Sequence, residues 1–238
     1  MTQMKRSRRR NLNKMEKIVK KKTQERQPWV PQEEGAKDPV YNCTLAVIPP
    51  WRTYGKILDI GCNFGEFTNR MRIFGAKEIV GFDFSPSVIK YAKKTYPDIN
   101  FFVGDICTVD FDNKFDLIMA SGVLNFHWLN LKEYESIAKK ISGWLNDDGY
   151  FVEQNNLDAM FGKKEKSFEI MEKYFDVVIH LDFYKHKSYT PEGMKGHFAK
   201  YRWVRLYEKK NVERIINTSN EDNNISFLKS VGNKLKSR

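Results

Sequence analysis

Cysteine is scarce in this chain of 238 residues, and long apolar segments are missing from it. The three cysteines, Cys43, Cys62 and Cys107, lack the spacing of a metal site and suggest no disulfide framework. We therefore expect no bound metal and a reducing, cytoplasmic compartment. No apolar run approaches the roughly 20 residues of a membrane-spanning helix, and no signal-peptide core follows the start. These absences leave a cytoplasmic globular protein as the expectation.

The positive charge of the chain is concentrated at its two ends. Residues 1–26 hold eleven Lys and Arg against two acids, and residues 209–238 hold seven against three. Blocks of like charge with few apolar residues repel one another and build no core. We expect a basic disordered tail at 1–26, one domain at 27–208 with its core at 55–208, and a mostly disordered polar tail at 209–238.

The basic tail has two functional alternatives to a solvated end. It can act as an arm that binds RNA through the phosphates. It can also lie on a membrane surface, because four apolar residues could form a thin apolar face, namely Leu12, Met15, Ile18 and Val19. Basic runs are signals of low specificity, so a solvated tail is the first expectation.

A glycine turn follows the first apolar run of the domain. Residues 57–60 lead into the pattern Asp-x-Gly-x-x-x-Gly, and apolar side chains then recur at helical spacing, at Phe64, Phe67, Met71 and Phe74. Glycine lets backbone come close to a ligand, and the N–H groups of a first helical turn point toward it. The pattern predicts a strand, a ligand-binding turn and a helix.

A carboxylate ends the second apolar run, eighteen residues after Gly65, at Asp83. A carboxylate at the tip of a strand can accept hydrogen bonds from both ribose hydroxyls of a nucleoside. The dinucleotide pattern Gly-x-Gly-x-x-Gly is broken, because Asn63 and Glu66 stand at its second and third glycines. The charge of Glu66 also disfavours a pyrophosphate. We predict a nucleoside-containing cofactor.

The first motif, Asp59-Ile60-Gly61-Cys62-Asn63-Phe64-Gly65, resembles that of class I S-adenosylmethionine-dependent methyltransferases, and the later loop at 121–128 resembles that of members acting on small molecules. The family usually has glycine where this chain has Asn63, and Asn adopts left-handed conformations more readily than most residues. Residues 80–85, 101–106, 115–124 and 145–151 resemble the later motifs in the family's order. The resemblance runs from about Lys56 to Tyr207.

The resemblance implies S-adenosylmethionine as cofactor and S-adenosylhomocysteine as product. It implies that Asp83 holds the cofactor's ribose and that Asp105 contacts the adenine amino group. The full set of implied cofactor-binding residues is Asp59, Gly61, Cys62, Asn63, Gly65, Asp83, Phe84, Asp105, Ile106, Ser121 and Gly122.

Strand and helix signals alternate along the domain. Ser85-Pro86 predicts a helix start, Pro97 its end, and Asn130 with Glu133 predicts a capping box. The last two apolar runs, 177–183 and 201–207, have no comparable long helix between them; in the family such runs form an antiparallel pair at the sheet edge. We predict an α/β fold: a three-layer, Rossmann-like, seven-stranded, mostly parallel sheet with an antiparallel edge pair and helices on both faces.

The loop after the fourth predicted strand, residues 121–128, is expected to form the active-site rim. His127 is its candidate general base, because an imidazole titrates near neutral pH. The alternative is a structural histidine that packs beside Trp128. Four further residues are candidates for contact with the acceptor: Tyr41, Asn125, Glu153 and Asn155. For Glu153 and Asn155, which are expected to follow the fifth strand, the alternative is capping of residues 157–161.

The same loop narrows the choice of methyl acceptor. It lacks the Asn/Asp-Pro-Pro-Tyr/Phe motif typical of enzymes that methylate adenine amines and the Pro-Cys pair of cytosine C5 enzymes. We expect transfer to a small molecule or glycan at an oxygen atom. An RNA such as tRNA is the alternative, because some wobble-uridine enzymes have a similar Gly-Val-Leu-Tyr-His run. A non-catalytic module of this fold is a third possibility, which the intact motif acids and glycines disfavour.

Overall fold

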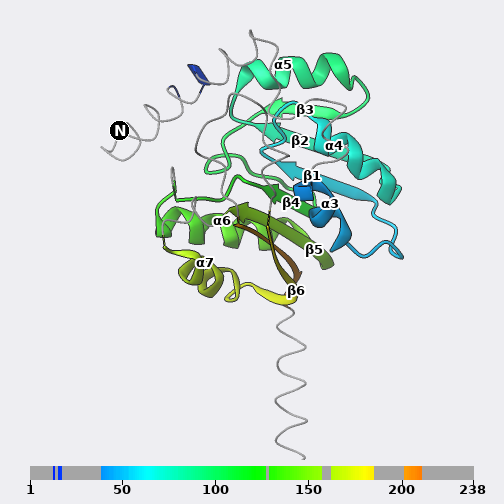
Figure 1. Ribbon diagram of the computed structural model, residues 1–238. Coiled ribbons are helices and arrows are strands. Elements are labelled where there is room, and N and C mark those ends of the chain that lie inside the picture. The colour runs from blue at the N-terminus through cyan, green and yellow to red at the C-terminus, as the bar shows by residue number, and fades with distance from the viewer. Residues whose placement is uncertain are drawn as a thin grey trace, which may run out of the picture.

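The computed structural model describes residues 13, 16, 17, 39–126, 129–156, 162–184 and 201–210 (Figure 1). A seven-stranded sheet in the order β3-β2-β1-β4-β5-β7-β6 forms its centre. The strands are β1 (Lys56–Ile60), β2 (Glu78–Asp83), β3 (Asn100–Val103), β4 (Phe115–Ser121), β5 (Leu145–Asn156), β6 (Phe175–Tyr184) and β7 (Tyr201–Lys209). The helices are α3 (Pro39–Ala46), α4 (Glu66–Arg70), the 3₁₀ helix η1 (Met71–Phe74), α5 (Pro86–Thr95), α6 (Leu131–Trp144) and α7 (Lys164–Met171).

Strands β1 to β5 are parallel, and β7 runs antiparallel to both of its neighbours, β5 and β6. The predicted fold class is therefore confirmed, including the antiparallel edge pair. The strand order reverses beside β1, which lies between β2 and β4. In open α/β sheets, ligands bind outside the carboxyl ends of the strands at such a reversal.

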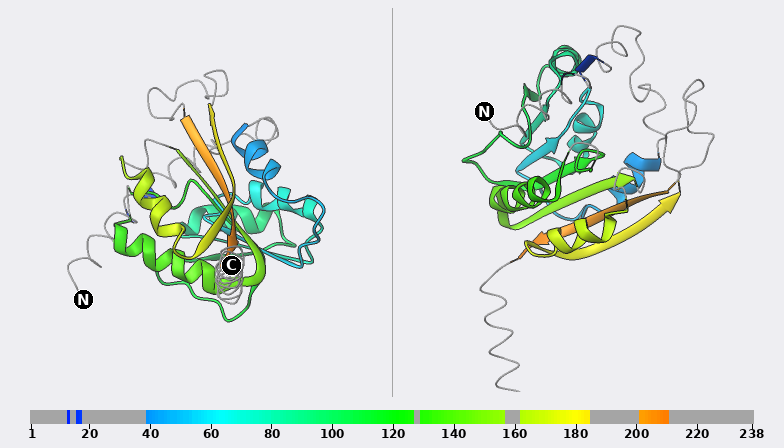
Figure 2. Two further views of the ribbon diagram at one scale, coloured as in Figure 1. Left: turned by 90° about the horizontal axis from the view of Figure 1, so that it is seen from below. Right: turned by 90° about the vertical axis from the view of Figure 1, so that its left-hand side faces the viewer.

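Helices cover both faces of the sheet, as Figure 2 shows in its left view. One core cluster joins α3, α4 and α5 to side chains such as Ile57 of β1 and Leu117 of β4. The other joins α6 and α7 to the alternate side chains, such as Leu58 and Ile118. Parallel strands that are covered on both faces carry near-continuous apolar runs, and this explains the sequence of β1.

The two predicted helix starts differ in their chemistry. The Asn130 side chain accepts hydrogen bonds from Lys132 N at 3.0 Å and Glu133 N at 3.1 Å, and Glu133 accepts from Asn130 N at 3.0 Å. The capping box is therefore confirmed. Ser85 precedes α5 as expected, but its hydroxyl lies 3.0 Å from Ser87 Oγ and makes no capping bond. Here Pro86, with its fixed φ, opens the helix.

The helix predicted after the glycine turn is divided into α4 and η1. The four apolar positions expected to face the core are all buried: Phe64, Phe67, Met71 and Phe74. Gly75 ends the segment in the left-handed conformation, with φ 68°. Within the described ranges, no helix has the length and apolarity needed to cross a membrane.

Candidate cofactor site

The glycine turn after β1 folds back onto the end of β2. The N–H groups of Gly61 and Cys62 both donate to the carbonyl of Phe82, at 2.8 and 3.0 Å, and Gly65 N donates to Cys62 O at 2.9 Å. Asn63 N donates to Asp83 Oδ2 at 3.2 Å. These four N–H groups are thus used to build the turn itself, and the N–H groups of the first helical turn, which the sequence suggested would face a ligand, begin after them at Glu66.

Three residues of the turn have left-handed backbone. Their φ angles are 72° at Gly61, 50° at Asn63 and 82° at Gly65. Asn63 is the only non-glycine residue with positive φ in the described part of the chain. The explanation for asparagine at the family's middle glycine is therefore confirmed, because Asn tolerates this region better than most side chains.

Glycine is also required in the turn because neighbouring side chains fill the adjacent space. A Cβ on Gly61 would overlap Val123 Cγ2, well inside the 3.0 Å that real Cβ atoms keep from their neighbours. A Cβ on Gly65 would lie 2.6 Å from Phe101 Cζ of β3. The loop after β4 therefore packs directly on the turn. The contact between Val123 and Gly61 could not be predicted from the sequence, since these residues are far apart along the chain.

Asp83 stands at the tip of β2 beside the turn. Its Oδ1 accepts from Ser85 N at 2.9 Å and its Oδ2 from Asn63 N at 3.2 Å. Burial raises the pKa of Asp83 to about 6, against the opposing effect of these backbone donors. A carboxylate has about four lone-pair sites, so Asp83 can still accept a further hydrogen bond beyond those from its backbone neighbours.

Asp59 lies beneath the turn and is 2% exposed. Thr68 of α4 donates to its Oδ2 at 2.6 Å, which ties the helix to β1. Burial, together with the nearby charge of Asp83, raises the pKa of Asp59 to about 7, although the hydrogen bond from Thr68 opposes this shift. Burial and the two carboxylates raise the pKa of the Cys62 thiol, so it stays protonated at neutral pH. The contribution of Thr68 was not foreseen from the sequence.

The segment after β3 lies next to Asp83. Gly104 N donates to Asp83 O at 2.9 Å, and Asp105 Oδ1 accepts from Cys107 N at 3.0 Å. Ile106 is buried and Phe84 is half-buried. The acids of the second and third motifs thus stand at the ends of adjacent strands, on the same edge of the sheet as the glycine turn.

Comparison with known proteins agrees with this geometry. Residues 57–149 match the family model described as a methyltransferase domain. Phosphoethanolamine N-methyltransferase 1 of Arabidopsis thaliana is 31% identical over 131 residues, which are 52% of this chain and 26% of that protein. Demethylmenaquinone methyltransferase of Chlorobaculum tepidum is 33% identical over 88 residues, which are 35% of this chain and 36% of that protein.

A solved structure shares the fold. It is the N-methyltransferase NodS from Bradyrhizobium japonicum in complex with S-adenosyl-l-homocysteine, with a TM-score of 0.61 and 18% identity over 73% of this chain and 89% of NodS. Residues 57–149 thus match a methyltransferase domain, and the chain shares the fold of an S-adenosylmethionine-dependent methyltransferase. The matches span only about a quarter to a third of the length of these curated relatives.

The geometry of this site is compatible with S-adenosylmethionine. Asp83 can accept a further hydrogen bond from a ribose hydroxyl, and Asp105 is half-buried on the same sheet edge, where the adenine is expected. The cofactor carries a sulfonium charge, which the carboxylates of this site would favour. No cluster of potential metal ligands is found among the residues that the structure describes.

The acceptor loop, defined here as residues 121–126, continues from β4 at the same sheet edge. Ser121 Oγ donates to Gln154 Oε1 at 2.9 Å, and Gly122, with φ 71°, is exposed. The Asn125 side chain is buried and donates to Gly122 O at 3.1 Å. His127, the candidate base, follows this loop and lies outside the described residues, as does Trp128.

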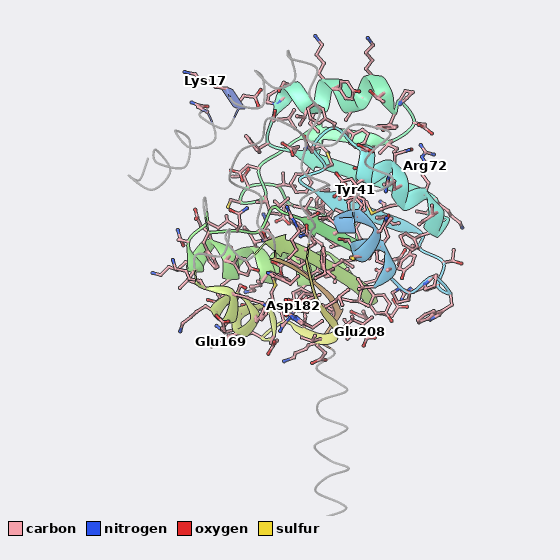
Figure 3. All side chains as sticks on the ribbon, viewed as in Figure 1. Lys17, Tyr41, Arg72, Glu169, Asp182 and Glu208 are labelled. Carbon is pink, nitrogen blue, oxygen red and sulfur yellow. The ribbon has the colours of Figure 1, made fainter. Side chains whose placement is uncertain are left out.

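The remaining acceptor candidates lie in α3, before β1, and in β5. Tyr41 of α3, labelled in Figure 3, stacks on Phe67 with ring centroids 4.4 Å apart, beneath the guanidinium of Arg70. Glu153 and Asn155 are completely buried, because β5 does not end before them but continues to Asn156. Glu153 Oε1 accepts from the Tyr134 hydroxyl, and Asn155 Nδ2 donates to the Leu124 carbonyl. Their expected position after the end of the fifth strand is therefore wrong, because both residues lie within β5.

Proposed function

We propose that this chain transfers the methyl group of S-adenosylmethionine to a small-molecule or glycan acceptor. The observation that carries the proposal is the position of Asp83, which accepts a hydrogen bond from Asn63 of the glycine turn. Val123 of the acceptor loop packs against Gly61 of the same turn. Cofactor and acceptor would thus meet at one edge of the sheet. Such alignment of two reactants supplies a large part of the catalysis of group transfer.

The protein's own residues have three tasks in this proposal. The bound cofactor supplies an electrophilic methyl group. The turn and the acids Asp83 and Asp105 would bind and orient the cofactor, and Val123 would close the space above Gly61 against water. His127 would take the proton that the acceptor releases, in the role of general base.

Two kinds of atom, oxygen and nitrogen, are candidates for receiving the methyl group. The polar groups of the acceptor loop favour an oxygen nucleophile, as expected from the sequence. Two of the relatives reported above are named for N-methyl transfer, and this supports an amine as the second candidate. RNA is a third kind of acceptor, supported by the Gly-Val-Leu run of the loop and by the basic residues 1–26, which lie almost entirely outside the described residues.

The test uses S-adenosylmethionine with a carbon-13 methyl group, incubated with host-cell extract and the full chain. The extract is then divided into RNA, protein and small molecules including glycans. Label in the small-molecule fraction supports the proposal, and the carbon-13 chemical shift of the product then distinguishes O-methyl from N-methyl. Label in RNA that disappears when residues 1–26 are deleted would replace the proposal with the RNA alternative.

A further inference from the structure

Three consecutive residues near the end of β5 bury polar side chains. Glu153, Gln154 and Asn155 are 0%, 1% and 0% exposed. Burying a polar group is unfavourable unless it finds a hydrogen-bond partner, so the partners indicate what each side chain does. Neighbouring residues of a strand point to opposite faces of the sheet. All three side chains nevertheless contact the acceptor loop, either directly or through Tyr134.

Gln154 holds the beginning of the acceptor loop. It lies opposite Ser121 in the pairing of β4 with β5. Its Oε1 accepts from Ser121 Oγ at 2.9 Å, and its carbonyl accepts from Gly122 N at 2.8 Å. The side-chain amide also donates to the Asn155 carbonyl at 3.0 Å, which fixes its orientation.

Asn155 holds the middle of the loop. Its Nδ2 donates to the carbonyl of Leu124. Leu124 is itself fully buried. Loss of this donor would leave a buried carbonyl without that partner, which favours opening of the loop.

Glu153 acts on the far end of the loop through Tyr134 of α6. The Tyr134 hydroxyl donates to Glu153 Oε1 at 2.6 Å. The Tyr134 ring stacks on Phe126, with centroids 5.2 Å apart and planes 26° apart. The carboxyl group therefore fixes the ring against which the end of the loop packs.

We propose that Glu153, Gln154 and Asn155 are positioning residues, which hold the acceptor loop against the glycine turn. The loop places Val123 over Gly61 and leads directly into His127. The inference rests on the proposed function, because the position of this loop matters for catalysis only if the acceptor binds beside it.

Hydrogen exchange of backbone amides tests the proposal directly. Asn125 N and Leu129 N are suitable reporters, because they donate within this region to Val123 O and Asn125 O. Asn155→Leu should speed their exchange about tenfold relative to amides of β1, as expected when a local opening loses one hydrogen bond. Thr44→Val is the matched control, since it removes a buried 2.6 Å bond within α3 and should leave the reporters unchanged relative to β1.

A second variant, Phe126→Ala, keeps the proposal testable if Asn155→Leu does not fold. Phe126→Ala removes a half-buried ring, detaches the loop from Tyr134 and should speed exchange at the same two reporters. Equal exchange relative to β1 in the wild type and in both variants would overturn the proposal. In the methyl-transfer assay, Asn155→Leu should lower kcat roughly tenfold or more through misplacement of the acceptor. A raised KM for S-adenosylmethionine with unchanged kcat would contradict this.

Failure of the proposed function gives a different result. If the wild-type chain does not bind S-adenosylhomocysteine in calorimetry, the cofactor assignment fails, whatever the exchange of the loop. If the wild type binds it and Asn155→Leu leaves the loop as protected as Thr44→Val does, only the positioning role is refuted.

Discussion

Gly61→Ala should be among the most destabilising single substitutions in the glycine turn. Two effects add at this position. Alanine in the left-handed region, at φ 72°, costs about 1–2 kcal/mol. The new methyl group would also overlap Val123 Cγ2, and overpacking of this kind costs about 1–3 kcal/mol. We expect a loss of about 2–5 kcal/mol in the free energy of unfolding, measured by urea denaturation.

The two effects can be separated by matched variants. Gly75 has φ 68° and nothing within 4 Å of a built Cβ, so Gly75→Ala should show the backbone strain alone, about 1–2 kcal/mol. Val123→Ala removes the overlapping methyl group, so the double variant with Gly61→Ala should regain about 1–3 kcal/mol over the sum of the single effects. If Gly61→Ala costs no more than Gly75→Ala, or if the double-variant coupling is zero, the packing of the loop on the turn is refuted.

Three further predictions concern separate parts of the domain. Asn63→Gly should be nearly neutral while Asn63→Val should cost about 1–2 kcal/mol in urea unfolding, because φ is positive there; equal effects would contradict the conformation. Asn130→Ala should cost about 1 kcal/mol through loss of the capping box, and a cost near zero in the same assay would show that the cap is unimportant. Glu153→Gln should become more stable relative to wild type as pH rises from 4.5 to about 8. Burial raises the pKa of Glu153 to about 8, so the wild type loses stability over that window, by at most about 1.4 kcal/mol per pH unit. A pH-independent difference between the two denaturation curves would refute this.

The elements of the sheet could be predicted because their signals are local. Apolar runs marked the strands, and the spacing of Asn130 and Glu133 marked the start of α6 with its capping bonds. The left-handed backbone at Asn63 followed from residue chemistry alone. Ser85 shows the limit of such reasoning, because a residue suited to capping has its hydroxyl against Ser87 instead.

The inner construction of the site could not be predicted, because it depends on partners far away in the sequence. The polar run at Glu153–Asn155 suggested the end of a strand, yet pairing with β7 extends β5 to Asn156. Burial of Glu153 depends on Tyr134, which lies nineteen positions earlier. No local pattern indicates that Val123 fills the space over Gly61. Sequence reasoning therefore located the site but not the contacts that hold it together.

The most direct test of the cofactor site is calorimetric titration of S-adenosylhomocysteine into the wild type and Asp83→Ala. Loss of a hydrogen-bonding carboxylate should weaken binding by about 1.5–3 kcal/mol. Asp98→Ala, which removes an exposed acid paired with Arg72, is the control and should bind as the wild type does. Binding that is unchanged in Asp83→Ala would contradict the placement of the cofactor at the tip of β2.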